Sequence, residues 1–379
     1  MNITPRTRTA LIFAAAIVLP FVGHNGGFTN FLADAGAYVL LALGLNIVVG
    51  FAGLLDLGYA AFFAIGSYSF AMLASPQFDL HLPFWLLLFI ASGIAGVFGI
   101  LLGAPTLRLR GDYLAIVTLG FGEIVPQTFL NLSQWTGGPN GISSLDQPEF
   151  SIPSSLVNGI CGSADKLHHW NVFGHCLGFT PLYRFGFDPL PYYFMVLALI
   201  ALAVWLASNM RNSRLGRAWM AIREDELAAA HMGINTTAAK LSAFALGASF
   251  SGLAGCALAS KLQLVSAEQF QFQVSVFILA MLVLGGMGNI TGVIVGSLVL
   301  SSLERFILPQ ATNFLHGFGL NVDLSNSRFL IYGVILVVMM LFRPEGLIPS
   351  GQRKAELHAA DADAGAASQE QELYTEAVH

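Results

Sequence analysis

Charged residues are scarce in this sequence. Only 10% of its 379 residues are Asp, Glu, Lys or Arg, against about 25% in an average soluble domain. Apolar residues make up 55%, and the mean hydropathy is +0.68. One globular core cannot bury so much apolar surface, so lipid must be the solvent for much of the chain. The composition excludes a soluble protein.

Chemically reactive motifs are also lacking. Three cysteines without a CxxC pair exclude a disulfide scaffold and a cysteine metal site. The loop histidines have no partners at metal-ligand spacing. We find no phosphate-binding glycine loop, no nucleophile with a base and no catalytic carboxylate pair. We therefore expect no enzyme, no cofactor and no use of ATP by this chain itself.

Positive charge is too sparse and scattered for nucleic-acid binding. The chain has 17 Lys and Arg against 22 Asp and Glu. Six of the acids lie after residue 350, where the sequence lacks periodic apolar residues. We expect residues 350–379 to be a disordered acidic cytoplasmic tail, and residues 1–349 to be a transmembrane domain.

Long apolar runs predict the membrane spans, because a helix needs about 20 apolar residues to cross a bilayer. The first run contains Pro20 and is the weakest; a signal peptide is the alternative, but no small-residue cleavage pattern follows it. The sequence predicts about ten transmembrane helices, near residues 8–23, 32–50, 54–75, 83–103, 113–132, 190–208, 239–260, 272–288, 290–306 and 328–342.

The predicted fold class is all-α, a polytopic membrane helix bundle. Of the 17 Lys and Arg, 12 fall in cytoplasmic segments if the N- and C-termini are both cytoplasmic, as the positive-inside rule requires. Residues 133–189 then form a long outside loop, and 209–238 form the main inside loop. Two halves of five spans would make any structural repeat inverted.

Two features suggest a translocation pathway. Residues 44–59 are rich in glycine and polar residues where two spans join, and backbone that is broken at membrane depth is tolerated where it lines a cavity; an ordinary turn is the alternative. Glu123 is an ionisable group inside a span, where such groups usually face the bundle interior. The pathway candidates are Asn46, Gly53, Asp56, Gly58 and Glu123.

The inside loop reads as an amphipathic helix. Ser213 or Asn212 could cap its start, Trp219 and Ile222 recur on one face, and Gly233 could end it in the left-handed conformation. Thr236 or Thr237 could cap the next helix. Such a helix at the membrane surface is suited to passing force from a soluble partner to the spans.

Several segments resemble the M-type permease subunit of bacterial branched-chain amino acid ABC importers. They are Leu45 to Tyr68, Leu107 to Glu123, Thr136 to Ile142, Gly216 to Asn235, Leu284 to Gly288 and Arg343 to Pro349, in that order. The general coupling pattern of such permeases, Glu-Ala-Ala followed after three residues by Gly, aligns with Leu227 to Gly233, with the acid displaced to Glu226.

The resemblance implies a multi-pass subunit of the bacterial inner membrane that carries Leu, Ile and Val. Its partners would be a second permease of the H-type, two cytosolic ATPases and a periplasmic substrate-binding protein. The residues implied to couple to the ATPase are Arg223, Glu224, Asp225, Glu226, Ala228, Ala229 and Gly233.

Alternatives remain open for the cargo and for the energy source. Asp56 stands where the family favours a neutral polar residue, and related permeases carry amides, urea or other amino acids. An ion-coupled secondary transporter would explain the spans and Glu123, but not the inside helix. In the outside loop, Cys161 and Cys176 lie 15 residues apart and could form a disulfide in an oxidising periplasm.

Overall fold

The computed structural model describes most of the membrane domain. The described residues are 16–20, 26–75, 82–106, 112–153, 169–172, 175–185, 188–317, 327–343 and 345–348. The tail 350–379 and most of the predicted first span 8–23 lie outside this set; of that span, residues 16–20 are helical.

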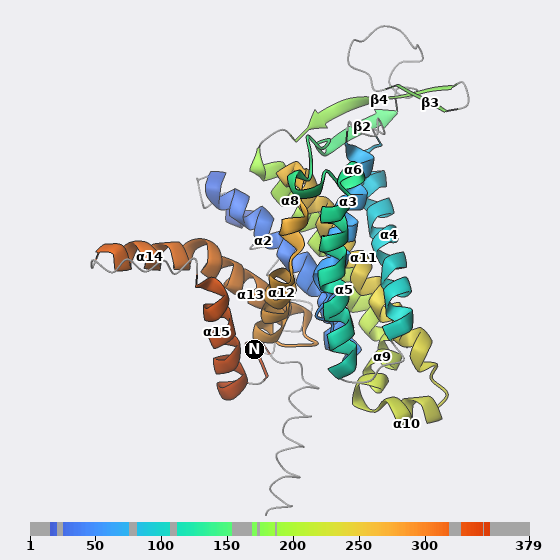
Figure 1. The fold of residues 1–379 in the computed structure, drawn as a ribbon, viewed down its shortest axis with the longest axis vertical. Helices are drawn as coiled ribbons and strands as arrows, with labels where there is room; N and C mark the ends of the chain where they lie inside the picture. Colours follow the sequence, from blue (N-terminus) through green and yellow to red (C-terminus); the bar gives the residue numbers. More distant parts are fainter. Residues whose placement is uncertain are drawn as a thin grey trace, which may run out of the picture.

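Long apolar helices build the molecule (Figure 1). They are α2 (Gly26–Leu45), continued by the π-helix η1 (Asn46–Phe51), α3 (Tyr59–Ala74), α4 (Phe84–Thr106), α5 (Asp112–Asn131), α8 (Pro189–Asn212), α11 (Thr236–Leu262), α12 (Phe272–Gly285), α13 (Ile290–Ser302) and α15 (Arg328–Phe342). Each matches one of the predicted spans from 32–50 onward. Seven described segments are long and apolar enough to cross a membrane, and α3 and α15 are shorter apolar helices.

Small residues hold the central helices together. A Cβ built on Gly66 of α3 would lie 2.4 Å from the Cα of Gly252 in α11, and one on Gly99 of α4 would lie 2.7 Å from the Ala248 side chain. Backbones this close leave no room for larger side chains, which is how membrane helices associate. Close packing of small residues therefore joins α3 and α4 to α11.

Two regions differ from the expected helices. The ninth predicted span does not end near residue 306: α13 continues through the π-helix η4 (Leu303–Ile307) into α14 (Leu308–Gly317), which extends sideways from the bundle (Figure 1). The predicted outside loop contains strands β2 (Glu149–Pro153), β3 (His169–Val172) and β4 (His175–Arg184), an antiparallel sheet of order β2-β4-β3. An all-α prediction omitted this sheet.

A second, two-stranded pairing joins distant parts of the chain. Strand β1 (Ile142–Ser143) pairs antiparallel with β5 (Leu264–Val265). The short helices α6 (Ser133–Thr136), η2 (Gly138–Asn140) and η3 (Ala267–Phe270) lie in the same connections. The pairing ties the end of α5 to the segment between α11 and α12.

The segment after α15 returns to the bundle and caps α12. Leu347 N donates to Leu284 O at 2.8 Å, and Ile348 N donates to Gly285 O at 3.2 Å. Asn289 Nδ2 donates to Ile348 O at 3.0 Å. The last carbonyls of a helix have no partners within it, and here the chain that follows the final helix supplies them.

Candidate functional site

The first predicted pathway segment is a break between α2 and α3. After η1, residues 52–58 are not helical, which agrees with the predicted interruption. Asn46 is 1% exposed, and its Oδ1 accepts a hydrogen bond from Gly288 N at 2.9 Å. A Cβ on Gly50 would lie 2.0 Å from that Oδ1 and 2.7 Å from Gly288 N. Asn46 therefore lies in a tight junction between η1 and the turn that joins α12 to α13.

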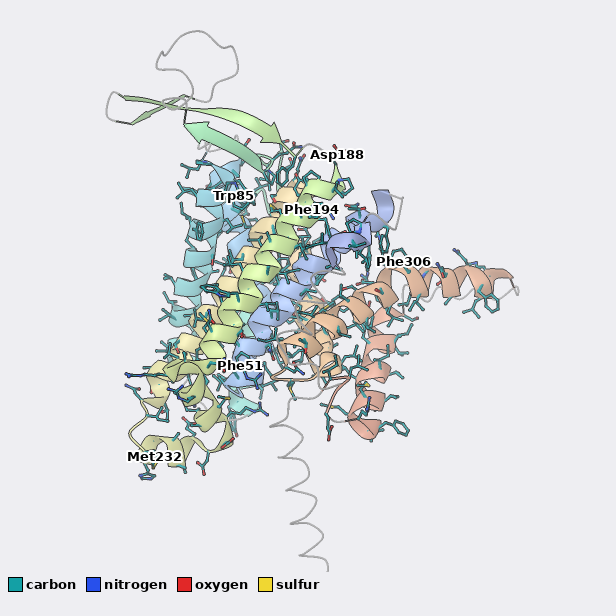
Figure 2. The ribbon with its side chains drawn as sticks, turned by 180° about the vertical axis from the view of Figure 1, so that it is seen from behind. Phe51, Trp85, Asp188, Phe194, Met232 and Phe306 are labelled. Atoms are coloured by element: carbon teal, nitrogen blue, oxygen red, sulfur yellow. The ribbon has the colours of Figure 1, made fainter. Side chains whose placement is uncertain are left out.

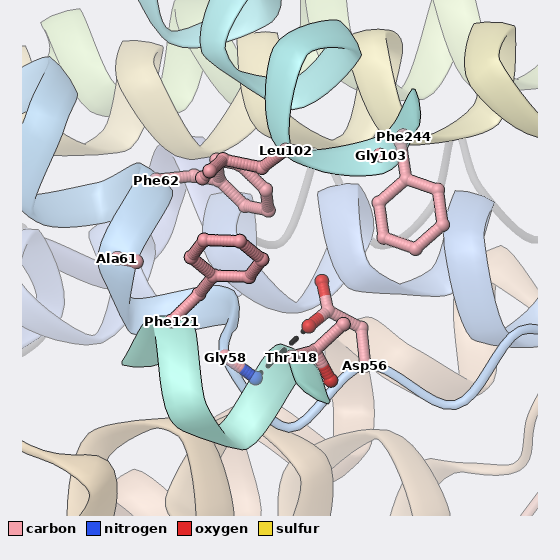
Figure 3. Close-up of a pocket in the computed structure, with 9 residues that line it drawn as sticks. All are labelled: Asp56, Gly58, Ala61, Phe62, Leu102, Gly103, Thr118, Phe121 and Phe244. Carbon is pink, nitrogen blue, oxygen red and sulfur yellow. Dashed lines mark hydrogen bonds between the residues drawn. The ribbon is translucent and has the colours of Figure 1, made fainter. Parts of the chain in front are cut away.

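Asp56 lies at the end of this break, buried at 2% exposure. Its Oδ1 accepts from Gly58 N at 2.9 Å, while Oδ2 has no hydrogen-bond partner in the described structure. The carboxyl group faces a cavity of about 10 Å³ lined also by Thr118, Phe121 and Phe244 (Figure 3). This is about the space that one water molecule needs. The structure thus brings Asp56 and Gly58 together beside a small cavity.

Burial changes the acidity of Asp56, which lies in the connection between helices. Desolvation raises the pKa of its carboxyl to about 6, while the hydrogen bond from Gly58 N and the nearby Thr118 hydroxyl act to lower it. A buried carboxylate is costly without full hydrogen bonding. The group is therefore poised to hold a proton at mildly acidic pH.

Glu123 lies on the outside of this chain and not in its interior, which corrects the expectation for its orientation. It is exposed together with Gln127, Thr128 and Asn131. Positions 123, 127 and 131 are four residues apart, so they form one stripe along α5. We call Glu123, Gln127, Thr128 and Asn131 the α5 polar face. Together with Ile124 and Leu132, they line an open groove of about 510 Å³.

The α5 polar face is poorly suited to contact with lipid tails. Only 28% of the most apolar stretch of α5 is buried, the smallest share among the seven described spans. The mean hydropathy of this stretch is also the lowest of the seven. A charged residue near the centre of a membrane helix costs about 2.5–3.5 kcal/mol on insertion scales, and such groups face protein or water. Among the described residues, the face is exposed and borders the open groove.

A second site is the loop between α8 and α11, at the opposite end of the bundle from β2, β3 and β4 (Figure 1). Helix α9 (Arg214–Glu224) starts at Ser213, whose hydroxyl accepts from Gly216 N at 3.3 Å. Trp219 is fully buried, and its Nε1 donates to Ala239 O of α11 at 2.8 Å. The predicted cap Ser213 and the predicted buried face of Trp219 and Ile222 are confirmed.

The loop helix does not run to Gly233 as predicted. It ends at Glu224, and Asp225 begins a second helix, α10 (Glu226–His231), by accepting from Leu227 N at 2.7 Å and Ala228 N at 3.0 Å. These two backbone donors lower the pKa of Asp225. The extended backbone of Asp225 turns the chain, because an N-cap residue is not helical. Asn235, and not a threonine, caps α11.

The predicted coupling residues divide between the two sides of this loop. Arg223 turns inward, where its Nη1 donates to Gly50 O at 2.7 Å. Ala229 is buried, and Glu226 forms an ion pair with Lys240 of α11. Glu224, Asp225, Ala228 and Gly233 are exposed, and Gly233 has the predicted left-handed conformation with φ of +83°.

Two exposed apolar side chains accompany them and were not predicted. Leu227 is 56% exposed, and Met232, at the tip of the loop in Figure 2, is 83% exposed. The sequence could have indicated this surface. Leucine and methionine side chains on a solvent-facing helix do not stabilise the chain by burial, so their presence there indicates a contact with another molecule. The exposed surface of Glu224, Leu227, Ala228 and Met232 is the α10 tip.

The remaining predicted site residues are Gly53, Cys161 and Cys176. Gly53 has φ of +70° and lies against the Arg223 side chain. The predicted Cys161–Cys176 disulfide lies outside the residues whose side chains are described and stays a prediction. The described residues contain no group of His, Cys, Asp and Glu that could hold a metal ion.

Comparison with known proteins gives one consistent result. Residues 27–339 match the family model of the branched-chain amino acid transport system permease component. The chain is 40% identical over 349 residues to the high-affinity branched-chain amino acid transport system permease protein LivM of Escherichia coli, covering 91% of this chain and 75% of that protein. It is 38% identical over 354 residues to LivM of Salmonella typhimurium, covering 93% and 76%.

A second kind of permease is more distantly similar. The high-affinity branched-chain amino acid transport system permease protein LivH of Escherichia coli is 26% identical over 329 residues, covering 84% of this chain and 93% of that protein. No solved structure matches the chain significantly.

Proposed function

We propose, from the premise that this chain belongs to the family of branched-chain amino acid transport permease components, that it is the M-type permease subunit of an ATP-binding cassette importer. It forms half of the translocation pathway for Leu, Ile and Val across the bacterial inner membrane. A second permease of the H-type, two cytosolic ATPases and a periplasmic substrate-binding protein complete the importer.

The α5 polar face is the observation that carries this proposal. Glu123, Gln127 and Asn131 form an open polar stripe on a span that this chain leaves largely uncovered. A second permease facing this stripe would enclose it and create a polar route between the two subunits, as intramembrane polar groups require. The similarity of this chain to both LivM and LivH supports a pairing of two related subunits.

The α10 tip supports attachment of an ATPase at the cytoplasmic end. Leu227 and Met232 present apolar surface, and Glu224 presents charge, on a loop held to the bundle by Trp219. Apolar anchors ringed by polar groups are typical of protein interfaces. No nucleotide-binding motif occurs in the chain, so hydrolysis belongs to the partners.

Uptake by the complete importer tests the proposal. The chain is reconstituted in liposomes with the second permease, both ATPases and the binding protein, and labelled leucine uptake is measured. We expect uptake that needs ATP, is blocked by vanadate and persists after proton and sodium gradients are collapsed. Uptake that follows an ion gradient without ATP would contradict the proposal, and transport of an amide or urea in place of leucine would change the cargo.

A variant of the polar face tests the pathway. Glu123→Leu removes the charge, and we expect it to assemble normally but to lower leucine uptake by about tenfold or more, because one charged hydrogen bond is worth roughly 1.5–3 kcal/mol. Ile100→Leu, at an exposed position of α4 outside this groove, is the control and should transport normally. Normal uptake by Glu123→Leu would place the pathway elsewhere.

A further inference from the structure

The three inward ties of the α8–α11 loop lead to two different parts of the bundle. Trp219 donates to Ala239 O, and Glu226 pairs with Lys240, so both hold the loop to α11. Arg223 instead reaches across to η1, donating to Gly50 O at 2.7 Å. Trp219 and Arg223 are one helical turn apart, so they share the inner face of α9. These contacts therefore connect the loop to α11 and, through Arg223, to the end of η1.

The Gly50 carbonyl, which accepts the hydrogen bond from Arg223, lies too near the end of η1 to be paired by a later N–H of that helix. Gly50 lies in the last turn of η1, which ends at Phe51, and the final carbonyls of a helix need outside donors. A cation at this end also interacts favourably with the helix dipole. The Arg223 guanidinium supplies both the donor and the charge from a different segment of the chain.

The fit around Arg223 is close on the η1 side. Gly53 has φ of +70°, and a Cβ there would lie 2.7 Å from Arg223 Cγ. The glycine therefore serves two needs, a left-handed turn and room for the arginine stem. A side chain at position 53 would displace the Arg223 stem and would also strain the left-handed turn.

Beyond Gly50, the contacts continue to the turn between α12 and α13. The Gly50 backbone lies against Asn46 Oδ1 and Gly288 N, and these two atoms hydrogen-bond to each other at 2.9 Å. All these groups are buried or partly buried. π-helical segments often occur at functional sites, and η1 lies between the Arg223 contact and the α12–α13 turn.

We infer that Arg223 is a positioning residue that transmits movement of the α9–α10 loop to η1 and the α12–α13 turn, and that it does not serve as an ATPase contact. This inference rests on the proposed function, because the movement would come from a bound ATPase. It assigns Arg223 and the exposed α10 tip different tasks: the tip binds the partner, and Arg223 couples the bound partner to the spans.

The number of ATP molecules hydrolysed per leucine transported tests this role in the complete reconstituted importer. We expect Arg223→Ala to assemble with the ATPase but to raise this ratio by about tenfold, a change that corresponds to ~1.4 kcal/mol. Arg223→Lys keeps a cation that can reach the carbonyl and should restore a ratio near that of the wild type. Arg217→Ala is the matched control, because Arg217 lies on the same helix and, in the described structure, donates to Asn212 O at the end of α8 and not to η1; it should leave the ratio unchanged.

Gly53→Ala approaches the same contact from the other side. It should raise the ratio like Arg223→Ala, and it decides the question if Arg223→Ala does not assemble. An unchanged ratio in Gly53→Ala and in any assembled Arg223→Ala complex, or a loss of ATPase binding by Arg223→Ala comparable to that of an α10 tip variant such as Met232→Asp, would overturn the inference. A wild-type importer that hydrolyses ATP without moving leucine would instead contradict the proposed function.

Discussion

Lys240 of α11 and Glu226 of α10 form an ion pair, with Lys240 Nζ 2.5 Å from Glu226 Oε1. The Lys240 side chain is 6% exposed and the Glu226 side chain 33%. Lys240 lies in the first turns of a predicted span, and the carboxylate compensates its charge there. The acid that the resemblance assigned to ATPase coupling thus also holds α10 to the membrane domain.

Removing Glu226 should destabilise the loop more than removing both partners. Glu226→Gln leaves the Lys240 ammonium buried without a counter-charge, at a cost of about 1–3 kcal/mol. Lys240→Met fills the same space without charge. We expect the double variant to recover part of the loss, measured as the thermal midpoint of the assembled complex. If the decreases in thermal midpoint of the two single variants simply add in the double variant, the two side chains do not interact.

Gly233 should tolerate only residues that accept a left-handed backbone. A Cβ at Gly233 would meet no atom within 4 Å, so the cost of a substitution comes from its φ of +83° alone. We expect Gly233→Val to cost roughly 1–3 kcal/mol and to reduce uptake together with substrate-stimulated ATP hydrolysis. Gly233→Asn is the control, because Asn adopts this conformation more readily. Wild-type transport by Gly233→Val, with the ATPase bound, would make this loop an ordinary connection.

Cysteine labelling should distinguish the α5 polar face from a lipid-facing surface. Thiols react as thiolates, which form in water and not in lipid. In a background with Cys161→Ser and Cys176→Ser, Gln127→Cys should react with a membrane-impermeant reagent in the assembled importer. Phe89→Cys on α4, where the native side chain is 66% exposed, should not react. Equal protection at both positions would place α5 against lipid or dry protein.

The stability of the chain should depend on pH through Asp56. In the unfolded chain this carboxyl loses its proton near its ordinary pKa of 3.8, and in the folded chain near 6. Between these values the folded state holds more protons, so raising the pH from about 4 to about 6 lowers the free energy of unfolding. Asp56→Asn keeps an acceptor for Gly58 N and removes the titration.

We expect the thermal midpoint of the wild type, taken relative to that of Asp56→Asn, to fall across this pH window and to level off above it. A constant difference between the two proteins would show that Asp56 does not carry a raised pKa.

The sequence predicts the membrane helices well because hydropathy and length are local properties. Helix α9 was also predictable, since Ser213, Trp219 and Ile222 carry its cap and its buried face. The break at Asp225 was not, because a run of four charged residues reads as a solvated helix surface and conceals a capping carboxylate. In the outside segment, β2 and β3 have only 5 and 4 residues, too few for their alternation of polar and apolar residues to be decisive. The ten-residue β4 contains Gly178 and Pro181, which are uncommon inside strands.

The orientation of Glu123 could not be read from one chain. A charge within a span indicates burial in protein or water, but the protein that covers it can be another subunit. Similarly, the role of Arg223 depends on Gly50, 173 residues away, and periodicity carries no information about such a distant contact. The sequence located these residues, and the fold determined which way they face.

The capping of α12 by residues 345–348 has a consequence for the order of synthesis. Leu284 and Gly285 receive their donors from Leu347 and Ile348, which leave the ribosome only after α13, α14 and α15. Chains fold largely from the N-terminus as they are made, so the end of α12 stays uncapped through the translation of the three helices that follow it. The last two carbonyls of α12 therefore receive these hydrogen bonds only after residues 347 and 348 have been synthesised.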